Sequence, residues 1–197
     1  MLITDLQYFG TISHIQSLIK ENQVYFDNQH PFSKMSFKNR MVIATAQGPL
    51  HLTIPIIGGR DQKLPLQDIQ IAYDSPWHNQ HYKALVSNYQ RSPYFEYYQD
   101  ELKGIYDSKP KMLIDFLMIV HIWTKKQIKG KWEIKKETSQ QVRLFDPYLP
   151  KNYQTFPLAI KYQQVFEDKT GFLHNLSILD LLFNCGGKQA NQLLLST

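Results

Sequence analysis

Short runs of hydrophobic residues, separated by polar residues and turns, fill the first 60 positions of the chain. Residues 2–6 and 24–27 have the length and apolar content of strands, and between them isoleucine and leucine recur at helical spacing over residues 11–20. Gly10 stands in the turn before this helix. The pattern therefore predicts a strand, a helix and a second strand as a small β–α–β unit at the start of the fold.

Two further apolar runs, at residues 41–46 and 50–57, flank a turn that contains Gly48 and Pro49. Both residue types favour a tight reversal of the chain, so the two runs are predicted to pair as a β-hairpin. Residues 66–72 form one more apolar run of strand length. These runs together predict a small mixed sheet in the N-terminal half.

From Ser75 onward the hydrophobic residues follow helical spacing. Ser75 with Pro76, and Ser92 with Pro93, each offer an N-cap followed by proline at the first helical position. Two further helices are predicted over residues 110–125 and 154–168, whereas residues 127–151 are polar and basic and show no clear pattern.

The last predicted helix begins at a Ser-x-x-Asp cap made of Ser177 and Asp180, and Gly186 with Gly187 predicts its end. The whole pattern predicts an α/β fold with a small mixed sheet in the N-terminal half and a helical C-terminal half. We expect a single domain over residues 1–197, because no repeat or low-complexity linker interrupts the chain.

Composition places the chain among ordinary globular proteins: 197 residues, 43% hydrophobic and 20% charged, with one cysteine. Such a chain is long enough to bury a core without disulfides or structural zinc. The N-terminus lacks the basic and apolar regions of a signal peptide, and charged residues interrupt the longest apolar run. That run, residues 112–123, is shorter than the ~20 residues of a membrane span. We therefore expect a cytoplasmic protein without a membrane span.

The net charge of +5 is concentrated in residues 126–197, which hold 10 basic and 6 acidic side chains. Within this region the basic tract 125–136 would attract phosphate through its summed field, or it is simply a solvated loop or hairpin. No nucleic-acid-binding motif accompanies it, so no nucleic-acid partner is expected.

Several catalytic signatures are missing from the sequence. It contains no P-loop, no Asp-x-Asp pair to hold a metal against a diphosphate, and no Gly-x-Ser-x-Gly nucleophile turn. No cofactor is indicated. Cys185 would act as a nucleophile only if a base reached it in space, and otherwise it is a buried thiol near the C-terminus.

His78 and His81 stand three residues apart on one predicted helix, a spacing that is able to hold a metal ion. No third ligand is indicated, so the alternative is a pair of surface histidines, although His81 shares a helical stripe with Trp77. An aromatic group at the start of the next helix offers stacking faces for sugar or base rings, or packs against the sheet. Its members are Tyr94, Phe95, Tyr97 and Tyr98.

A basic cluster surrounds the predicted hairpin. Lys34, Lys38 and Arg40 flank Asn39 just before its first strand, and Arg60 follows its second strand. If the two strands pair, these side chains lie at one end of the hairpin and form a cradle for a phosphate or carboxylate. The alternative is an exposed hairpin end with ordinary surface charges.

Several of these segments, in their order and spacing, resemble the bacterial WbqC-like family. The matching segments are Tyr8 with Phe9, residues 34–40, residues 52–60, Trp77 with His81, residues 89–95 and residues 175–186, so the likeness covers roughly residues 1–124 and 154–187. The resemblance implies a role in surface-polysaccharide synthesis, with transfer of glycine or another aminoacyl group to a sugar as the proposed reaction. Its candidate site residues are Tyr8, Lys34, Asn39, Arg40, Arg60, Trp77 and His81.

Two hypotheses follow. In the first, the protein is a transferase in which Lys34, Arg40 and Arg60 hold a phosphate or carboxylate, Trp77 stacks on a sugar and His81 is the general base. In the second, the same groove binds a sugar nucleotide or a partner protein without catalysis, as an assembly factor. A nucleotidyltransferase-like interpretation, based on Gly10 and His14, lacks the paired histidines of that class. The sequence does not predict an oligomeric state.

Overall fold

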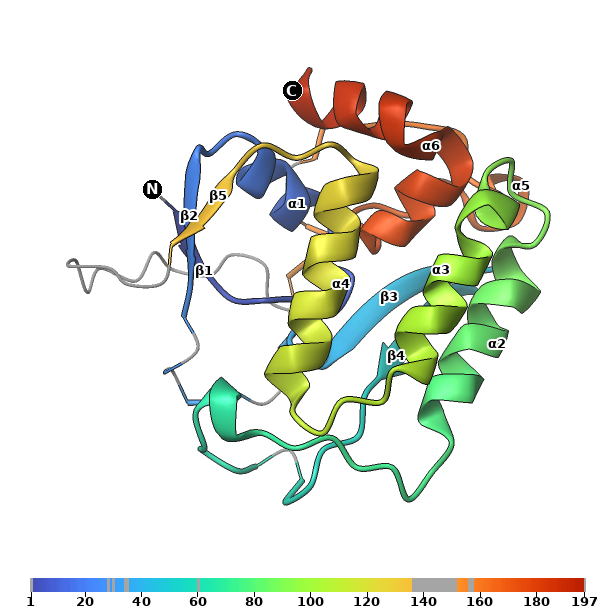
Figure 1. Cartoon of the computed structure of the whole chain (residues 1–197). Coiled ribbons are helices and arrows are strands. Elements are labelled where there is room, and N and C mark those ends of the chain that lie inside the picture. Colours follow the sequence, from blue (N-terminus) through green and yellow to red (C-terminus); the bar gives the residue numbers. More distant parts are fainter. Residues whose placement is uncertain are drawn as a thin grey trace.

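The computed structural model describes residues 2–27, 29, 31–33, 36–59, 61–135, 152–155 and 158–196. It has a mixed α/β fold, with its small sheets in the N-terminal half and most helices in the C-terminal half (Figure 1). This confirms the fold class predicted from the hydrophobic pattern.

The chain begins with the predicted β–α–β unit. Strand β1 (Leu2–Thr4) leads through α1 (Ile12–Ile19) to β2 (Gln23–Phe26), and the two strands pair in parallel. Thr11 caps α1, because its side chain accepts a hydrogen bond from the His14 amide. A third parallel strand, β5 (Glu133–Lys135), pairs with β2 and gives the order β1-β2-β5. The sequence did not predict β5.

The hairpin is also confirmed. Strand β3 (Arg40–Thr45) pairs antiparallel with β4 (Gly48–Thr53), with Val42 opposite His51. The reversal falls at residues 46–47, and Gly48 has a positive φ of 112° that a side chain would oppose. The turn is therefore tighter than the sequence predicted.

Two predicted elements are wrong. Residues 66–72 form the short 3₁₀ helix η1 (Leu66–Asp68) and isolated bridges rather than a strand. Residues 158–164 have no regular secondary structure, and among the described residues of the predicted range 154–168 the only helical ones are the start of α5 (Glu167–Thr170). In this segment buried and exposed side chains alternate from Leu158 to Gln164, a period of two that a helix would not produce.

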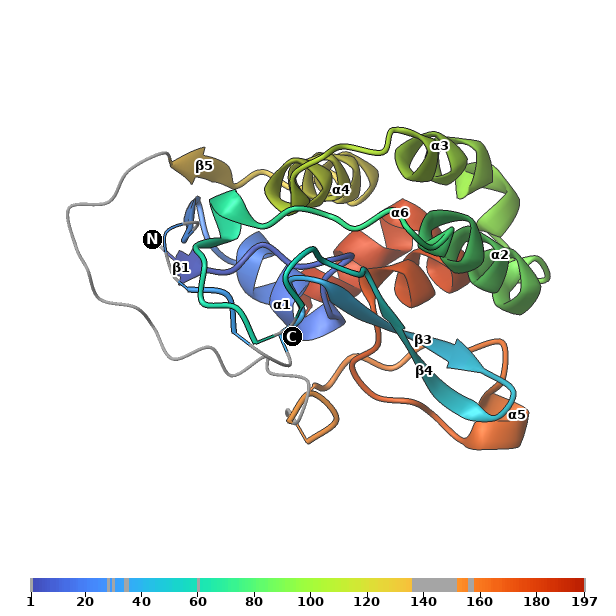
Figure 2. The same cartoon turned by 90° about the horizontal axis from the view of Figure 1, so that it is seen from below.

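The four long helices are α2 (Trp77–Tyr89), α3 (Phe95–Asp107), α4 (Leu113–Gln127) and α6 (Ile178–Leu195). The two predicted serine caps are absent, since neither α2 nor α3 has a side-chain cap. Instead the Ser92 hydroxyl donates to the Tyr89 carbonyl oxygen and closes the end of α2. Figure 2 shows α2, α3 and α4 on one side of the molecule, the hairpin on the other, and α1 with α6 between them. No helix among the described residues is long and apolar enough to cross a membrane.

A fully buried carboxylate, Asp180, joins α6 to three other parts of the fold. Its oxygens accept hydrogen bonds from the hydroxyls of Tyr89 at 2.7 Å and Tyr162 at 2.5 Å, and from the Gln164 amide at 3.1 Å. The Tyr89 oxygen in turn accepts from the Ala44 amide of β3. Burial raises the pKa of Asp180, and the three donors oppose that rise. Ser177 caps α6 as predicted, whereas the Asp180 side chain takes part in this network and not in the cap.

The predicted helix end at the glycines is confirmed for the first segment of α6, but a second helical segment follows directly, which the sequence did not predict. Gly186 leaves the helical region with φ of 70°, and the helix resumes beyond it as far as Leu195. The glycines let α6 approach its neighbours. A Cβ atom on Gly186 would stand 2.8 Å from the Tyr94 ring, and one on Gly187 would stand 2.1 Å from the Gln127 carbonyl oxygen at the end of α4.

We expect Gly187→Ala to lower the free energy of unfolding by at least about 2 kcal/mol, because backbone atoms cannot yield to the added methyl group. The matched control is Gly104→Ala on the exposed face of α3, where no atom lies within 4 Å of the added Cβ. That change should raise stability by about 0.5 to 1 kcal/mol through helix propensity. Urea denaturation of both variants measures the difference, and equal stabilities would contradict the proposed close packing.

Candidate functional site

The connection between β1 and α1, residues 5–11, is buried throughout and carries side chains to two polar clusters. The Tyr8 amide donates to the Phe37 carbonyl oxygen, and the Thr11 amide donates to the Gln7 side chain. Phe9 has a positive φ of 42°, which is rare for a bulky residue and must be held by its surroundings. The Ser177 hydroxyl supplies this support by donating to the Phe9 carbonyl oxygen at 2.7 Å.

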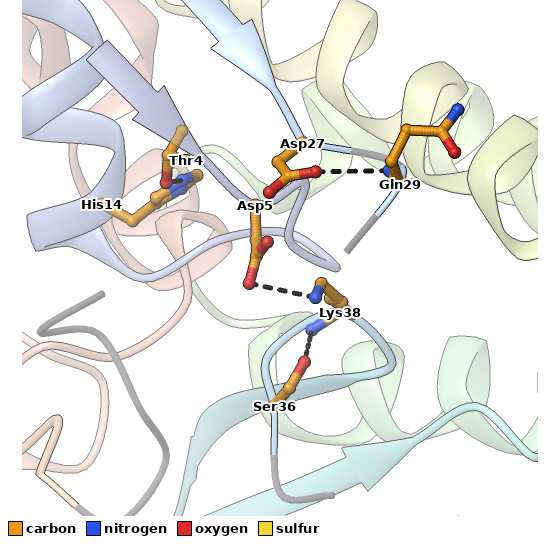
Figure 3. A network of polar contacts seen from close by, with 7 residues as sticks. All are labelled: Thr4, Asp5, His14, Asp27, Gln29, Ser36 and Lys38. Atoms are coloured by element: carbon orange, nitrogen blue, oxygen red, sulfur yellow. Dashed lines mark hydrogen bonds and ion pairs between the residues drawn. The ribbon is translucent and has the colours of Figure 1, made fainter. Parts of the chain in front are cut away.

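The first cluster, here the carboxyl-edge cluster, consists of Thr4, Asp5, His14, Ser36 and Lys38 (Figure 3). It lies where β1 ends, and the carboxyl ends of parallel strands are the usual place for ligands in α/β folds. The Lys38 ammonium lies 3.2 Å from an Asp5 oxygen, with side-chain exposures of 0% and 7%. The Ser36 hydroxyl accepts from the Lys38 amide, and His14 contacts the Thr4 hydroxyl at 3.3 Å.

The structure changes the picture of the basic cluster at the hairpin. Lys38 is buried against Asp5, so its charge is already compensated inside the protein. The Asn39 side chain donates to the Ile54 carbonyl oxygen and fastens the open end of the hairpin. Arg40 is half-buried at the start of β3, and its Nε has no hydrogen-bond partner among the described residues. Lys34 and Arg60 lie outside the described residues.

The second cluster, here the tyrosine–histidine cluster, consists of Tyr8, Trp77, His78, His81 and Tyr106. The Tyr8 hydroxyl lies 2.9 Å from His81 Nδ1 and 2.6 Å from the Tyr106 hydroxyl. The Trp77 ring meets His81 edge to face, with centroids 5.2 Å apart. Three residues singled out by the sequence, Tyr8, Trp77 and His81, are thus brought together from the first loop and α2.

Burial distinguishes this cluster from what the sequence predicted. His78 and His81 are both buried, so the expectation of two surface histidines is wrong. Trp77 is only 3% exposed, with Phe116 and Tyr73 against its ring, so no open face remains for a stacked sugar. Tyr106 is a member that sequence reasoning missed, because nothing in its spacing separates it from a core residue.

Two buried nitrogens of this cluster have no hydrogen-bond partner in the described part of the chain, namely Trp77 Nε1 and His78 Nδ1. Buried polar atoms are nearly always paired, so this local deficit indicates a place for a polar ligand or water. Burial, with a smaller contribution from His78, lowers the pKa of His81 to about 4. The pKa values of Tyr8 and Tyr106 are raised by burial. All three groups are therefore neutral at pH 7.

Residues 6–144 and 149–192 match the WbqC-like protein family. The chain belongs to this family. The matched residues include every candidate site residue that the sequence analysis named. The chain is also 24% identical over 218 residues to the uncharacterised protein Rv1507c of Mycobacterium tuberculosis (strain ATCC 25618 / H37Rv), covering 94% of this chain and 91% of that protein. No solved structure matches the chain.

Other chemistry considered for this WbqC-like chain finds less support. Burial, and then the Asp180 charge, raise the pKa of the Cys185 thiol to about 11, which does not suit a nucleophile. Among the described residues, no group of three or more histidine, cysteine, aspartate or glutamate side chains is placed to hold a metal ion.

We expect Lys38→Met to lower the free energy of unfolding by about 3 to 5 kcal/mol, because it leaves the buried Asp5 carboxylate without this cation. The double variant Asp5→Leu with Lys38→Met should recover part of the loss, since neither charge then remains. Urea denaturation of wild type and the two variants tests this. A single variant as stable as wild type would show that the ion pair is dispensable.

Stability should fall in mild acid because three buried histidines resist protonation. Burial lowers the pKa of His14 to about 3, and the pKa values of His81 and His121 to about 4. In the unfolded chain these groups titrate near 6.5, so below that pH the unfolded state binds more protons. Each histidine then costs up to about 1.4 kcal/mol of stability per pH unit. Urea titrations at pH 7, 6 and 5 measure the slope, and His121→Gln should reduce it.

Proposed function

We propose that this chain is a transferase of bacterial surface-polysaccharide synthesis, moving glycine or another aminoacyl group onto a hydroxyl of a sugar or sugar nucleotide. Membership of the WbqC-like family supports the setting. The observation that supports the chemistry is the environment of His81. Its Nδ1 contacts the Tyr8 hydroxyl, which contacts Tyr106, and its α2 neighbours Trp77 and His78 each have a buried nitrogen without a partner among the described residues.

His81 is the general base of this proposal. With Nδ1–H donating to the Tyr8 oxygen, and the Tyr8 hydroxyl donating to Tyr106, Nε2 carries the free lone pair. Nε2 takes the proton of the sugar hydroxyl while its oxygen attacks the acyl carbon of an activated aminoacyl donor. The bond to the donor's leaving group breaks, and that group departs with the electron pair. Tyr8 acts by orienting the imidazole and stabilising the imidazolium.

Substrate contacts follow from the atoms without partners. Trp77 Nε1 donates to a substrate oxygen, so Trp77 acts through its N–H rather than through its ring face. Arg40, in the basic cluster at the hairpin, has a side-chain nitrogen without a hydrogen-bond partner among the described residues. Its guanidinium suits a phosphate or a carboxylate. Tyr8, being fully buried, positions His81 instead of touching the substrate.

A non-catalytic assembly factor is the second candidate, and one observation favours it. A pKa of about 4 makes His81 a weak base at neutral pH, whereas catalytic bases are usually tuned toward the working pH. In this second function, the neutral imidazole of His81, held in place by Tyr8, is a rigid hydrogen-bonding group for a bound sugar nucleotide. The two candidates differ in whether His81→Gln abolishes the function or only weakens binding.

The test is complementation of a strain that lacks the encoding gene, with the aminoacyl content of its surface polysaccharide measured by mass spectrometry. Wild type should restore that content, and His81→Gln should lower the product by about 10²-fold to 10⁴-fold, the usual range for a lost general base. Tyr8→Phe should have a smaller effect, of about tenfold, because the imidazole loses its orienting partner. His174→Gln, at an exposed histidine outside both clusters, is the control and should behave as wild type.

Unchanged aminoacyl content in the deletion strain would exclude the proposed transfer. Full complementation by His81→Gln would instead favour the assembly factor. Melting curves of each variant are needed, since a loss through unfolding would also remove the product.

A further inference from the structure

A second candidate site lies on the surface between the start of α3, the end of α4 and the kink in α6. It is a cavity of about 730 Å³, and none of its lining residues belongs to the carboxyl-edge or the tyrosine–histidine cluster. Cavities of this size hold small-molecule ligands in many proteins. We call it the α6 cavity.

Two aromatic rings offer faces to the α6 cavity. Tyr94 is 43% exposed and Tyr97 is 76% exposed, and both line it. Their neighbours Phe95 and Tyr98 are buried instead. The aromatic group at the start of α3 therefore divides between a buried pair, of which Tyr98 also lines the cavity, and an outer pair whose exposed ring surface is available for stacking. Stacking of a base on an aromatic side chain contributes to binding with any base.

The charge of the cavity is positive. Lys126, Lys129 and Lys188 line it, and no acidic side chain is among the described residues that do. Lys126 is partly compensated by Glu101 at 2.8 Å. Lys129 and Lys188 form no ion pair with any other described residue. Two uncompensated ammonium groups in one hollow repel each other, and an anion would relieve that repulsion.

Lys129 also occupies a backbone position that glycine would fill more easily. Its φ is 52°, in the left-handed region that commonly follows a helix end and favours glycine. The next residue is Gly130, and its lack of a side chain is explained by the Trp132 ring at 2.1 Å from the position of a Cβ atom. The Lys129 side chain is exposed at this turn.

The resumed part of α6 adds to the positive potential. Gly187 and Lys188, at the start of this second helical segment, line the cavity. Helix N-termini carry partial positive charge and favour phosphate groups. The glycines that make the kink thus bring a helix start next to the lysines.

We infer that the α6 cavity binds a nucleoside phosphate, with its base or sugar ring on Tyr94 and Tyr97 and its phosphates on Lys129 and Lys188. The inference does not rest on the proposed transfer reaction, because His81 takes no part in it. Other occupants fit less well: inorganic phosphate leaves the tyrosine faces empty, and an uncharged sugar leaves the lysines unpaired.

The test is isothermal titration of the whole chain with uridine 5′-diphosphate, adenosine 5′-diphosphate, uridine and pyrophosphate. Both nucleotides should bind more tightly than uridine or pyrophosphate alone. Lys188→Gln and Lys129→Gly should each weaken nucleotide binding about tenfold, the effect of about one charge-assisted contact. Lys129→Gly is decisive because glycine suits that turn, so its melting temperature should not fall.

Control variants test the contacts to the base and the contacts to the phosphates separately. Tyr97→Leu should weaken nucleotide binding at least about fivefold, whereas Tyr97→Phe keeps the ring and should bind as wild type. Lys161→Gln, an exposed lysine outside the cavity, should change nothing.

Three outcomes would overturn the inference. The first is no binding of either nucleotide at millimolar concentration. The second is binding that both lysine variants leave unchanged. The third is pyrophosphate binding as tight as nucleotide binding and insensitive to Tyr97→Leu, which would reduce the cavity to a plain anion site.

Discussion

The contact between the first loop and the residues that precede α6 organises the molecule. The Ile12 amide donates to the Leu176 carbonyl oxygen, the Ile178 amide donates to the Gly10 carbonyl oxygen, and Ser177 caps its own helix while holding Phe9. These bonds join residues more than 160 positions apart. They hold a loop whose backbone is strained at Phe9, and strain of that kind persists only where surrounding contacts determine the conformation.

Both polar clusters depend on that loop. Asp5 lies at its start and pairs with Lys38, while Tyr8 lies three residues later and reaches His81. Because the loop is fixed at both ends, the position of the Tyr8 hydroxyl next to α2 is restricted. A shift of the segment before α6 would therefore move the imidazole partner as well as the core. Stability and site geometry are coupled through the same few hydrogen bonds.

Local patterns predicted well wherever an element is determined by its own residues. The helix α1, the β3–β4 hairpin and the Ser177 cap are examples, because amphipathic spacing, turn residues and a cap are local signals. The strand β5 was missed since its three residues become a strand by pairing with β2. The segment 158–164 was assigned to a helix although buried and exposed side chains alternate along it, and its Tyr162 and Gln164 bond the buried Asp180, a tertiary contact that local spacing does not show.

Of the candidate site, the sequence located Tyr8, Trp77 and His81 but not their burial. Whether a histidine is exposed or buried depends on which helices pack around it. The sequence of the histidine's own helix does not contain that information. The same limit affected the basic cluster, since Lys38 found a carboxylate 33 positions earlier in the chain. Spacing predicts which residues share a face, whereas the partner that neutralises a charge is a property of the tertiary fold.

The two halves of the molecule consequently differ in their electrostatics. Around the first loop, the phenols and imidazoles are neutral and Lys38 is matched by Asp5, so this interior carries little net charge. At the α6 cavity, lysines stand on the surface without acidic neighbours in its lining. The excess positive charge of the C-terminal region is thus partly gathered at one hollow. Desolvated neutral groups suit proton transfer and hydrogen bonding, while exposed cations with aromatic neighbours suit capture of an anion. The two regions lie near opposite ends of α3, since Tyr106 stands near its end and Tyr97 near its start.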